Sequence, residues 1–252
     1  MTAGLPPKGC LIIPVYRHLQ PLREVLQGLE KYNLPCFLVD DANATPLAEA
    51  LTADLRGRSW VEVIRLPAHG GKGAACLAGG RAAYDKGFTH GIFVDADGQH
   101  DTEDIPRVLA LMRQYPRAMI LGSPQFDHSA PSGRRFGRIV SNVWVWLETL
   151  SFDIQDSLCG FRCLPLDPLL KIAAKTRLGI RMDFDPDIVV RLFWQGVPVV
   201  NFDTQIRYPS GGISNFRLWV DNAALCGLHT RLFFGMLWRS PSLIRRHWTA
   251  VP

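Results

Sequence analysis

The stretch Gly91-Ile-Phe-Val-Asp-Ala-Asp-Gly-Gln-His100 joins an apolar run to a cluster of oxygen-bearing side chains. Its first part, Gly91–Val94, predicts a buried strand, because short apolar runs bounded by turn residues are typical of parallel sheets. Asp95 and Asp97 follow the run directly, and Gln99 adds a further oxygen. Mg²⁺ and Mn²⁺ prefer such oxygen ligands and often share them with substrate phosphates. The stretch therefore predicts a divalent-metal site at the end of a strand, with a solvated loop as the alternative.

Four further apolar runs repeat this pattern along the chain. They lie at Cys10–Val15, Cys36–Val39, Val61–Ile64 and Ala118–Leu121. The stretches between them place apolar residues at helical spacings of three and four, as at positions 22, 25, 26 and 29. Strands that alternate with amphipathic helices predict βαβ units, and therefore an α/β fold with a central, mostly parallel sheet. Ligands bind such sheets beyond the carboxyl ends of the strands.

The second half of the chain is less regular. We expect helices over Arg138–Leu150, Leu169–Ala174 and Pro186–Trp194, strands over Val197–Phe202 and Gln205–Tyr208, and a last helix over residues 214–238. The Pro-Ser-Gly-Gly run at 209–212 predicts a flexible break before that helix, because glycine tolerates most backbone angles. No linker is long enough to separate two independent domains.

Composition excludes several classes of protein. With 47% apolar residues the chain can bury a core, so it is not disordered. The sequence has no run of about 18 uncharged apolar residues, and no basic start followed by an apolar run. Its six cysteines are scattered, so no zinc site is expected, although Cys159 and Cys163 are spaced to share a helix face. We therefore expect a reduced, cytoplasmic protein.

Two segments carry candidate binding residues for a nucleotide or another anion. Asp40 and Asp41 close the second apolar run, where a carboxylate can accept hydrogen bonds from a base or a ribose. A cap for a helix near Thr45 is the alternative. The Gly-Gly-Lys-Gly run at 70–73 opens a predicted helix, where backbone N–H groups and the charge of Lys72 suit a phosphate. A tight turn into a closely packed helix is the alternative for that run.

Two later segments combine acids with other functional side chains. Asp156 and Arg162 flank Gly160, and they suit a general base and a cation that orients a substrate or a diphosphate. A structural ion pair is the alternative. The run Asp183-Phe-Asp185-Pro-Asp187 precedes a predicted helix, and one of its acids suits a base that faces a hydroxyl group. Favourable negative charge at a helix N-terminus is the alternative there.

In their order, these segments resemble the family 2 glycosyltransferases, especially the dolichyl-phosphate mannosyltransferase-like branch. The resemblance covers about residues 10–215. Its motifs are Ile13-Pro14-Val15-Tyr16, Val39-Asp40-Asp41, Gly71-Lys72-Gly73-Ala74, Val94–His100, Leu121-Gly122-Ser123, Asp156-x-x-x-Gly160-Phe161-Arg162 and Phe184-Asp185-Pro186-Asp187.

The resemblance implies a GT-A fold, a Rossmann-like domain for nucleotide-diphospho-sugars, here over residues 8–213. It implies a metal-dependent enzyme that transfers the sugar, with inversion at the anomeric carbon, to a lipid, a lipid-linked or another hydroxyl or phosphate acceptor. For the nucleotide sugar it implies Pro14, Tyr16, Asp40, Asp41, Lys72 and Asp95, and for Mg²⁺ or Mn²⁺ it implies Asp95, Asp97 and Gln99. Asp156 and Asp187 match acids near the sugar acceptor, and Arg162 completes the catalytic candidates.

The chain departs from the family at positions that bear on the choice of sugar acceptor. The family often has asparagine and glutamate where this chain has Arg17 and His18. Pro124 stands where the family has an arginine after Gly-Ser, so a cation near the sugar acceptor is missing. The missing cation weakens the expectation of a polyprenyl-phosphate acceptor, unless it is replaced by Arg134, Arg135 or Arg207.

The C-terminal segment 214–252 mixes aromatic residues with arginines. From residue 205 onward there are six arginines and one aspartate, which accounts for the whole net charge of +5. Aromatic and basic side chains together suit a membrane interface. We therefore expect this tail to dock at an anionic membrane surface on the cytoplasmic face, as for an enzyme of the cell envelope. Packing on the catalytic domain alone is the alternative.

The sequence is also compatible with two other functions. One is a catalytically weak protein that binds a nucleotide sugar without turnover. Another is a nucleotidyltransferase, which also places acids on a Rossmann-like sheet. Nucleic acid is not an expected partner, because the aromatic residues are not interleaved with basic ones on a sheet-like motif.

Overall fold

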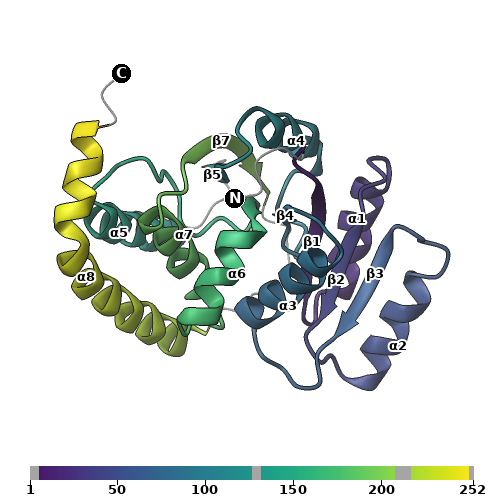
Figure 1. Cartoon of the computed structure of the whole chain (residues 1–252). Helices are drawn as coiled ribbons and strands as arrows, with labels where there is room; N and C mark the ends of the chain where they lie inside the picture. The colour runs from purple at the N-terminus through teal and green to yellow at the C-terminus, as the bar shows by residue number, and fades with distance from the viewer. Residues whose placement is uncertain (1–5, 127–131, 208–216, 250–252) are drawn as a thin grey trace.

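A computed structural model describes residues 6–126, 132–207 and 217–249 of the chain. Its centre is a seven-stranded sheet in the order β3-β2-β1-β4-β6-β5-β7 (Figure 1). Neighbouring strands are parallel, except that β6 runs antiparallel to β4 and β5. The α/β class and the mostly parallel sheet are therefore confirmed. The strands are β1 (Gly9–Val15), β2 (Cys36–Asp40), β3 (Val61–Arg65), β4 (His90–Phe93), β5 (Met119–Phe126), β6 (Arg162–Pro165) and β7 (Val199–Ile206).

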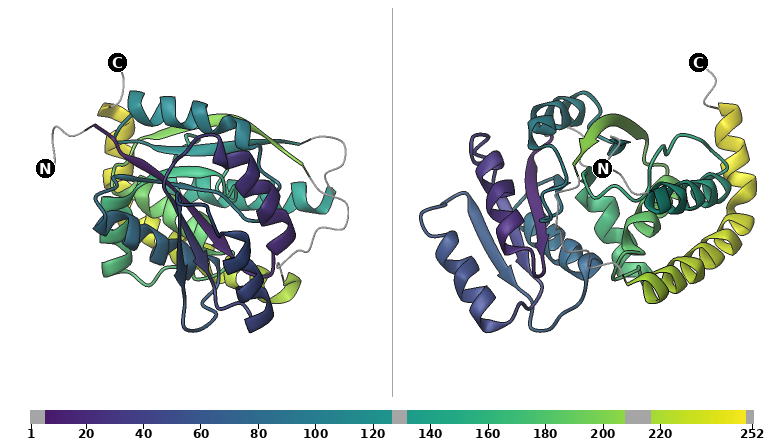
Figure 2. Two further views of the ribbon diagram at one scale, coloured as in Figure 1. Left: turned by 90° about the vertical axis from the view of Figure 1, so that its right-hand side faces the viewer. Right: turned by 180° about the vertical axis from the view of Figure 1, so that it is seen from behind.

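Helices cover both faces of this sheet (Figure 2). Along β1, Cys10 and Ile12 point into one core, and Leu11 and Ile13 point into the other. This alternation has the two-residue period of a strand, and burial on both faces explains why the strands read as continuous apolar runs. The helices are α1 (Leu19–Glu30), α2 (Thr45–Asp54), α3 (Lys72–Asp85), the short 3₁₀ helix η1 (Thr102–Asp104), α4 (Ile105–Gln114), α5 (Ser132–Thr149), α6 (Leu166–Lys175), α7 (Phe184–Trp194) and α8 (Leu218–Thr249).

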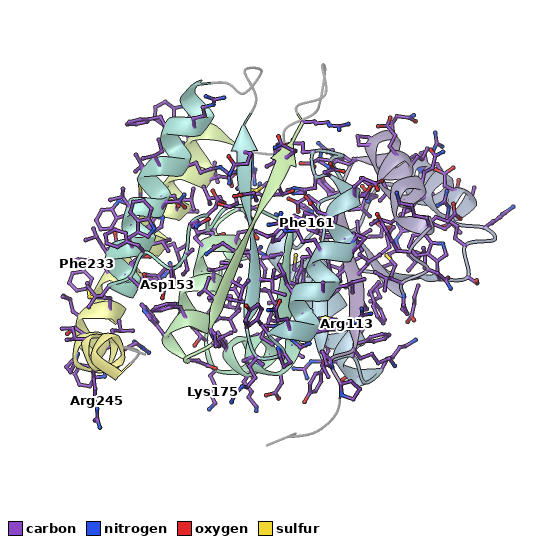
Figure 3. All side chains as sticks on the ribbon, turned by 90° about the horizontal axis from the view of Figure 1, so that it is seen from above. Arg113, Asp153, Phe161, Lys175, Phe233 and Arg245 are labelled. Carbon is purple, nitrogen blue, oxygen red and sulfur yellow. The ribbon has the colours of Figure 1, made fainter. Side chains whose placement is uncertain are left out.

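The two cores belong to different sets of helices. Leu26 of α1 and Val108 of α4 are buried against one face of the sheet. Ala83 of α3, Leu169 of α6 and Ile188 of α7 are buried against the other face. Figure 3 shows Phe161 inside the body of the molecule, whereas Arg245 projects from the far end of α8.

The order of the strands creates a switch point beside β1. The chain passes from β1 to β2 and β3 on one side, and α3 then returns it to β4 on the other side of β1. The connections that leave the carboxyl ends of β1 and β4 therefore run in opposite directions, and open α/β sheets bind their ligands in the crevice between such connections. Tyr16 follows β1, and Asp95 lies just beyond β4.

The second half of the chain differs from expectation in three places. Residues 199–206 form one strand, β7, where two were predicted. Strand β6 was not predicted, because it contains an arginine and a proline and is only four residues long. Cys159 and Cys163 share no helix face, since Cys163 lies in β6 and Cys159 in the loop before it.

Helix α8 has 32 residues and curves around α5 and α7 at the edge of the molecule (Figure 1). It buries Leu228, Leu232 and Met236 in the core that α7 shares. Its expected start, the predicted break at 209–212 and the expected domain boundary at 213 lie outside the described residues. Among the helices that the structure describes, none is long and apolar enough to span a bilayer.

Candidate functional site

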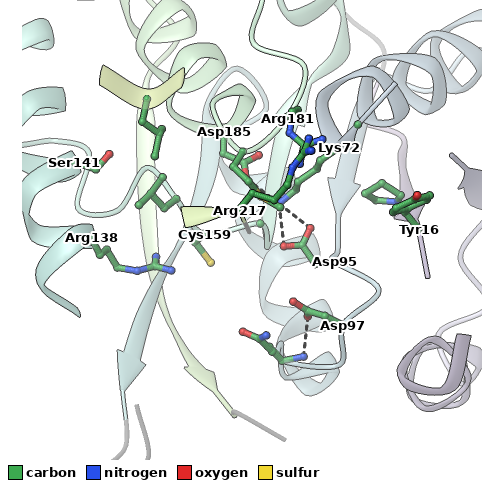
Figure 4. Close-up of a pocket in the computed structure, with 18 of the residues that line it drawn as sticks. Tyr16, Lys72, Asp95, Asp97, Arg138, Ser141, Cys159, Arg181, Asp185 and Arg217 are labelled. Carbon is green, nitrogen blue, oxygen red and sulfur yellow. Dashed lines mark hydrogen bonds and ion pairs between the residues drawn. The ribbon is translucent and has the colours of Figure 1, made fainter. Parts of the chain in front are cut away.

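A cavity of about 1290 Å³ lies beyond the carboxyl ends of β1, β2 and β4. Figure 4 shows Tyr16 at one end of it, Ser141 and Arg138 at the other, and Lys72 and Asp95 between them. We refer to these as the Tyr16 end, the Ser141 end and the centre. The sheet and the loops after its strands form the Tyr16 end and the centre, whereas α5 and α8 form the Ser141 end.

An aromatic pair marks the Tyr16 end. The rings of Tyr16 and His69 stack with centroids 4.0 Å apart. His69 Nδ1 lies 2.8 Å from an Asp41 carboxylate oxygen. Asp41 also accepts hydrogen bonds from the backbone N–H groups of Gly70 and Gly71, at 2.7 and 2.9 Å. The buried Asp41 thereby fixes both the stacked ring and the loop that leads into α3, which makes a rigid platform for a planar group.

The two neighbouring acids after β2 have different surroundings. Pro14, Tyr16 and Asp41 line the cavity as the nucleotide expectation requires, whereas Asp40 does not. Asp40 Oδ1 accepts hydrogen bonds from the backbone N–H and the side-chain amide of Asn43, at 2.9 and 2.7 Å. Asp40 therefore closes the turn after β2. The helix-cap alternative is wrong, because α2 has no side-chain cap at its start.

The Gly-Gly-Lys-Gly run opens α3, as predicted. Gly71 has φ of +87°, and a Cβ there would lie 2.5 Å from the backbone oxygen of Ile180, so only glycine fits. The helix start then presents Lys72 to the centre of the cavity. Lys72 Nζ lies 2.8 Å from Asp95 Oδ1 and 2.8 Å from Asp185 Oδ2. One ammonium group therefore joins a carboxylate just beyond β4 to a carboxylate in the first turn of α7.

Asp95 remains ionised in this arrangement. Burial alone would raise the pKa of the Asp95 carboxyl, but the Lys72 ammonium and the His100 ring hold that pKa well below its usual range. Gly160 explains how the acid fits, because a Cβ at that position would lie 2.0 Å from Asp95 Oδ2. The glycine between Asp156 and Arg162 is thus required by the acid that follows β4.

The expected metal ligands suit a hard divalent cation. Asp95, Asp97 and Gln99 all line the cavity, and the backbone N–H of Gln99 donates to Asp97 Oδ1 at 3.1 Å. In the described residues, no group of three or more His, Cys, Asp and Glu side chains forms a complete metal cluster. Mg²⁺ is usually held by one or two carboxylates together with substrate phosphates. These residues therefore fit a metal that is bound jointly with a diphosphate.

Asp156 and Arg162 lie beneath the cavity surface. Asp156 Oδ1 accepts from the backbone N–H groups of Leu158 and Cys159, at 3.0 and 2.7 Å, and from the Arg138 guanidinium. Arg162 is 1% exposed and forms an ion pair with Asp185. Neither side chain lines the cavity. The geometry gives both residues a supporting role, in which Asp156 shapes the loop and Arg162 holds Asp185.

Of the three alternating acids, Asp183 precedes α7, and Asp185 and Asp187 lie in its first turn. Asp185 lines the cavity, whereas Asp187 does not. Asp187 is fully buried, accepts from the backbone N–H of Gly179 at 2.9 Å, and forms an ion pair with Arg191. Burial raises the pKa of Asp187, although Arg191 opposes that shift. The structure thus places Asp187 as an anchor of the segment before α7, behind the cavity wall.

Several residues that line the cavity were not predicted. His69 adjoins the Gly-Gly-Lys-Gly run, and His100 ends the Val94–His100 motif, but neither histidine was assigned a role. Arg181 and Arg217 are joined through Asp221, which binds the Arg181 Nε at 3.0 Å and the Arg217 backbone N–H at 2.6 Å. These arginines bring positive charge to the wall where α8 begins. Arg134, Arg135 and Arg207 were the arginines expected to replace the missing cation. The Arg134 side chain lies outside the described residues, and Arg135 and Arg207 do not line the cavity.

Comparison with known proteins finds a matching family. The model of glycosyl transferase family 2 matches residues 10–160. The chain is similar to the undecaprenyl-phosphate mannosyltransferase of Micrococcus luteus, with 27% identity over 244 residues, covering 88% of this chain and 97% of that protein.

Solved structures share the fold. Glucosyl-3-phosphoglycerate synthase from Mycobacterium tuberculosis, in complex with Mn²⁺, uridine-diphosphate-glucose and phosphoglyceric acid, has a TM-score of 0.60 at 12% identity, covering 92% of this chain and 78% of that one. Mannosyltransferase PcManGT from Pyrobaculum calidifontis, in complex with GDP-mannose and Mn²⁺, has a TM-score of 0.56 at 15% identity, covering 82% of this chain and 59% of that one. These likenesses confirm the expected GT-A arrangement.

Proposed function

Because the chain belongs to glycosyl transferase family 2, we propose that it transfers a sugar from a nucleoside-diphosphate donor to a polyprenyl phosphate at a membrane surface. We propose further that the reaction needs Mg²⁺ or Mn²⁺ and inverts the anomeric carbon. The observation that carries this proposal is that the candidate donor-binding residues line one cavity. It joins an aromatic platform, a lysine at a helix start and a pair of carboxylates in one continuous space.

The nucleotide would occupy the Tyr16 end. A planar base suits the stacked rings of Tyr16 and His69, whose positions are fixed by Asp41. The donor's diphosphate then extends toward the centre, where α3 begins. A helix start offers backbone N–H groups and a positive dipole to an anion, and Lys72 adds a full charge. The solved structures of similar fold in complex with UDP-glucose and GDP-mannose support a nucleotide sugar as the donor.

Asp95, Asp97 and Gln99 would hold the metal together with the diphosphate. A bound divalent cation would neutralise the charge that develops on the leaving diphosphate. Lys72 contributes to the same task, and its contacts with Asp95 and Asp185 keep it aimed at the centre before the donor arrives. The phosphate of the sugar acceptor attacks the anomeric carbon from the face opposite the leaving group. It needs no base, because it is already an anion.

The Ser141 end suits a lipid. Helix α5 carries an exposed apolar stripe, whose members repeat at helical spacings of three and four. We call it the α5 stripe, and it consists of Phe136, Ile139, Val140, Val143, Trp144 and Leu147. Phe136, Val140 and Trp144 also line the cavity, so the stripe leads from the surface into the site. An isoprenoid chain on this stripe would place its phosphate inside the cavity.

Helix α8 packs against α5 and also carries exposed aromatic residues. Trp219 and Trp238 are 85% and 87% exposed, and Arg239 and Arg245 lie on the same helix. Large exposed apolar patches mark interaction surfaces, and aromatic residues with arginines suit the boundary between lipid headgroups and acyl chains. The net charge of +5 favours an anionic bilayer. Membrane docking would therefore bring the Ser141 end to the lipid.

A donor titration tests the proposed reaction. We expect the purified protein to bind one of UDP-, GDP- or dTDP-sugars by calorimetry, more tightly with Mn²⁺ than without it. Asp97→Ala should remove the effect of Mn²⁺ because it deletes one carboxylate of the predicted pair. Failure to bind any of these donors, with or without Mn²⁺, would contradict the donor site. Tight donor binding without sugar transfer to a polyprenyl phosphate would favour a binding protein, and nucleotidyl transfer from a nucleoside triphosphate would favour the nucleotidyltransferase alternative.

Vesicle binding tests the membrane surface. We expect replacement of Trp219 and Trp238 by serine to weaken binding to phosphatidylglycerol vesicles by about tenfold or more, because buried tryptophan surface contributes roughly 25 cal/mol per Å². Tyr115→Ser is the matched control, since Tyr115 is also exposed and follows α4, away from α5 and α8. Sedimentation with vesicles measures the binding of the tryptophan variant and of the control. Equal binding by all three proteins, or no binding by the unaltered protein, would contradict membrane docking.

A further inference from the structure

Arg181 reaches the cavity from the segment between α6 and α7. That segment lies against the start of α3, because the backbone oxygen of Ile180 accepts a hydrogen bond from the Gly73 N–H at 2.9 Å. A Cβ at Gly71 would lie 3.2 Å from Arg181 Cγ, so the arginine stem packs against the glycine that precedes the helix. Figure 4 shows Arg181 beside Lys72, the first residue of α3. Two cations therefore lie at one helix start.

A buried carboxylate of α8 holds Arg181 in this position. Asp221 is 1% exposed, and its Oδ1 accepts a hydrogen bond from Arg181 Nε at 3.0 Å. Its Oδ2 accepts from the backbone N–H of Arg217 at 2.6 Å, so both carboxylate oxygens are used. Among the described residues, none accepts a hydrogen bond from the two terminal nitrogens of the Arg181 guanidinium. Most of its N–H donors therefore remain for a ligand.

Arg217 brings a further positive charge to the same wall. It lies at the start of α8, is exposed, and lines the cavity. In the part of the chain that the structure describes, its guanidinium is paired with no carboxylate, since Asp221 contacts only its backbone. The two arginines thus stand beside a single buried acid, and the wall keeps a positive charge for a ligand. Guanidinium groups stay charged at physiological pH and bind phosphate oxygens through paired N–H donors.

The charges already present in the centre leave room for this cation. Lys72 and Arg162 are paired with Asp95 and Asp185, so these four groups offset one another. Asp97 accepts from a backbone N–H and forms an ion pair with no described basic side chain. In the proposed reaction the diphosphate gains a further negative charge when the sugar leaves it. Additional cations at the start of α3 would therefore stabilise the departing group.

A purely structural ion pair is the alternative for Arg181 and Asp221. A structural pair would bury the arginine as well, as the fold does with Arg162. The Arg181 side chain is instead 23% exposed and lines the cavity, whereas its acid is buried behind it. A buried acid that fixes an accessible guanidinium suits the positioning of a ligand-binding group.

We propose that Arg181, positioned by Asp221, binds the diphosphate of the nucleotide-sugar donor together with Lys72, and that Arg217 adds charge to the same site. Arg181 contacts the diphosphate, whereas Asp221 is a positioning residue that acts through the guanidinium. Because Asp221 lies in the first turn of α8, the helix that is proposed to meet the membrane also completes the donor site. This inference rests on the proposed function for the identity of the ligand, but diphosphate binding can be measured without sugar transfer.

Calorimetry with UDP, GDP and dTDP in the presence of Mg²⁺ tests the diphosphate site. We expect Arg181→Gln to weaken binding of the nucleoside diphosphate that the protein prefers by about tenfold to a hundredfold, because hydrogen bonds to charged groups are the stronger ones. Arg181→Lys keeps the charge but loses the fork of N–H donors, so it should recover part of that loss. Arg177→Gln is the matched control, since Arg177 is exposed in the same segment and does not line the cavity.

Geranyl phosphate separates the donor from the sugar acceptor as the source of the phosphate that Arg181 binds. We expect Arg181→Gln and the unaltered protein to bind geranyl phosphate equally. A larger loss for geranyl phosphate than for the nucleoside diphosphate would assign Arg181 to the sugar acceptor and overturn the proposal. Equal binding of the nucleoside diphosphate by Arg181→Gln and the unaltered protein, or no binding of any of the three by the latter, would also overturn it.

Steady-state kinetics separate this inference from the proposed function. Asp221→Asn keeps the shape of the side chain but removes its charge. It should raise the KM for the donor several-fold and leave the KM for polyprenyl phosphate unchanged, a split that a general loss of packing would not produce. Binding of a nucleoside diphosphate without any sugar transfer would contradict the proposed function alone. Transfer with an unchanged donor KM in Arg181→Gln would contradict this inference alone.

Discussion

Replacement of Lys72 by methionine should lower kcat/KM for the sugar donor by about 10²–10³, or roughly 3–4 kcal/mol of transition-state stabilisation. Methionine keeps most of the length and the apolar stem of lysine, so the change removes mainly the charge. Lys72 is 15% exposed at its side chain, and its ammonium lies within 2.8 Å of both Asp95 and Asp185. In the proposed reaction it faces the leaving diphosphate, whose negative charge grows in the transition state.

The loss of Lys72 should have a second consequence. Asp95 owes its low pKa, against the opposing effect of burial, first to the Lys72 ammonium and then to His100. Without the lysine, the pKa of the Asp95 carboxyl should rise toward its ordinary value, so metal binding should weaken at acidic pH. Measurements of donor turnover at several Mn²⁺ concentrations would show this as a higher metal requirement.

Two variants make the Lys72 result interpretable. Lys72→Arg keeps the charge but changes its geometry, so it should retain part of the activity lost in Lys72→Met. Lys171→Met is the matched control, because Lys171 forms an exposed pair with Asp167 on α6, outside the cavity. It should behave as the unaltered protein does. Full turnover by Lys72→Met would show that the lysine serves only to hold Asp95 and Asp185 in place.

The centre of the site could be predicted from sequence because its parts follow strand ends. Val94-Asp95-Ala96-Asp97 continues an apolar run, and parallel strands deliver their carboxyl ends to one edge of the sheet. Lys72 was predicted for the same reason, since glycines mark the start of its helix. What each residue touches was not predictable. Lys72 meets Asp185, 113 positions away, and no local pattern records that contact.

The acceptor side could not be predicted to the same extent. Asp185 and Asp187 flank Pro186 on either side, and the docking of α7 decides which one reaches the cavity. His229, which lines the cavity, lies in a helix whose apolar pattern indicates packing, and its hydrogen-bond partners come from α5, 88 and 81 positions earlier. Long-range pairing of helices, not motif spacing, builds this end of the site.

Arg162 offers the clearest test of a supporting role, because its side chain is buried within the β6 strand. Its guanidinium forms an ion pair with Asp185 and donates to the Asp185 backbone oxygen at 3.2 Å. Burial lowers the pKa of Arg162, so the fold holds this charge against a desolvation cost. Removing one partner of such a pair leaves the other charge poorly compensated. If Arg162 only oriented a substrate, its removal would not lower the free energy of unfolding.

We expect Arg162→Met to lower the free energy of unfolding by about 3 kcal/mol, the lower end for a broken buried pair. The lower end applies because Asp185 keeps Lys72 as a partner. Adding Asp185→Asn should recover part of that loss, since it removes the charge that Arg162 neutralises. Urea denaturation measures these differences, and Arg23→Met, which breaks an exposed pair with Asp54, should leave the midpoint unchanged. If Arg162→Met unfolds at the same urea concentration as the unaltered protein but loses turnover, then Arg162 acts on the substrate, as its position in the Gly-Phe-Arg motif first indicated.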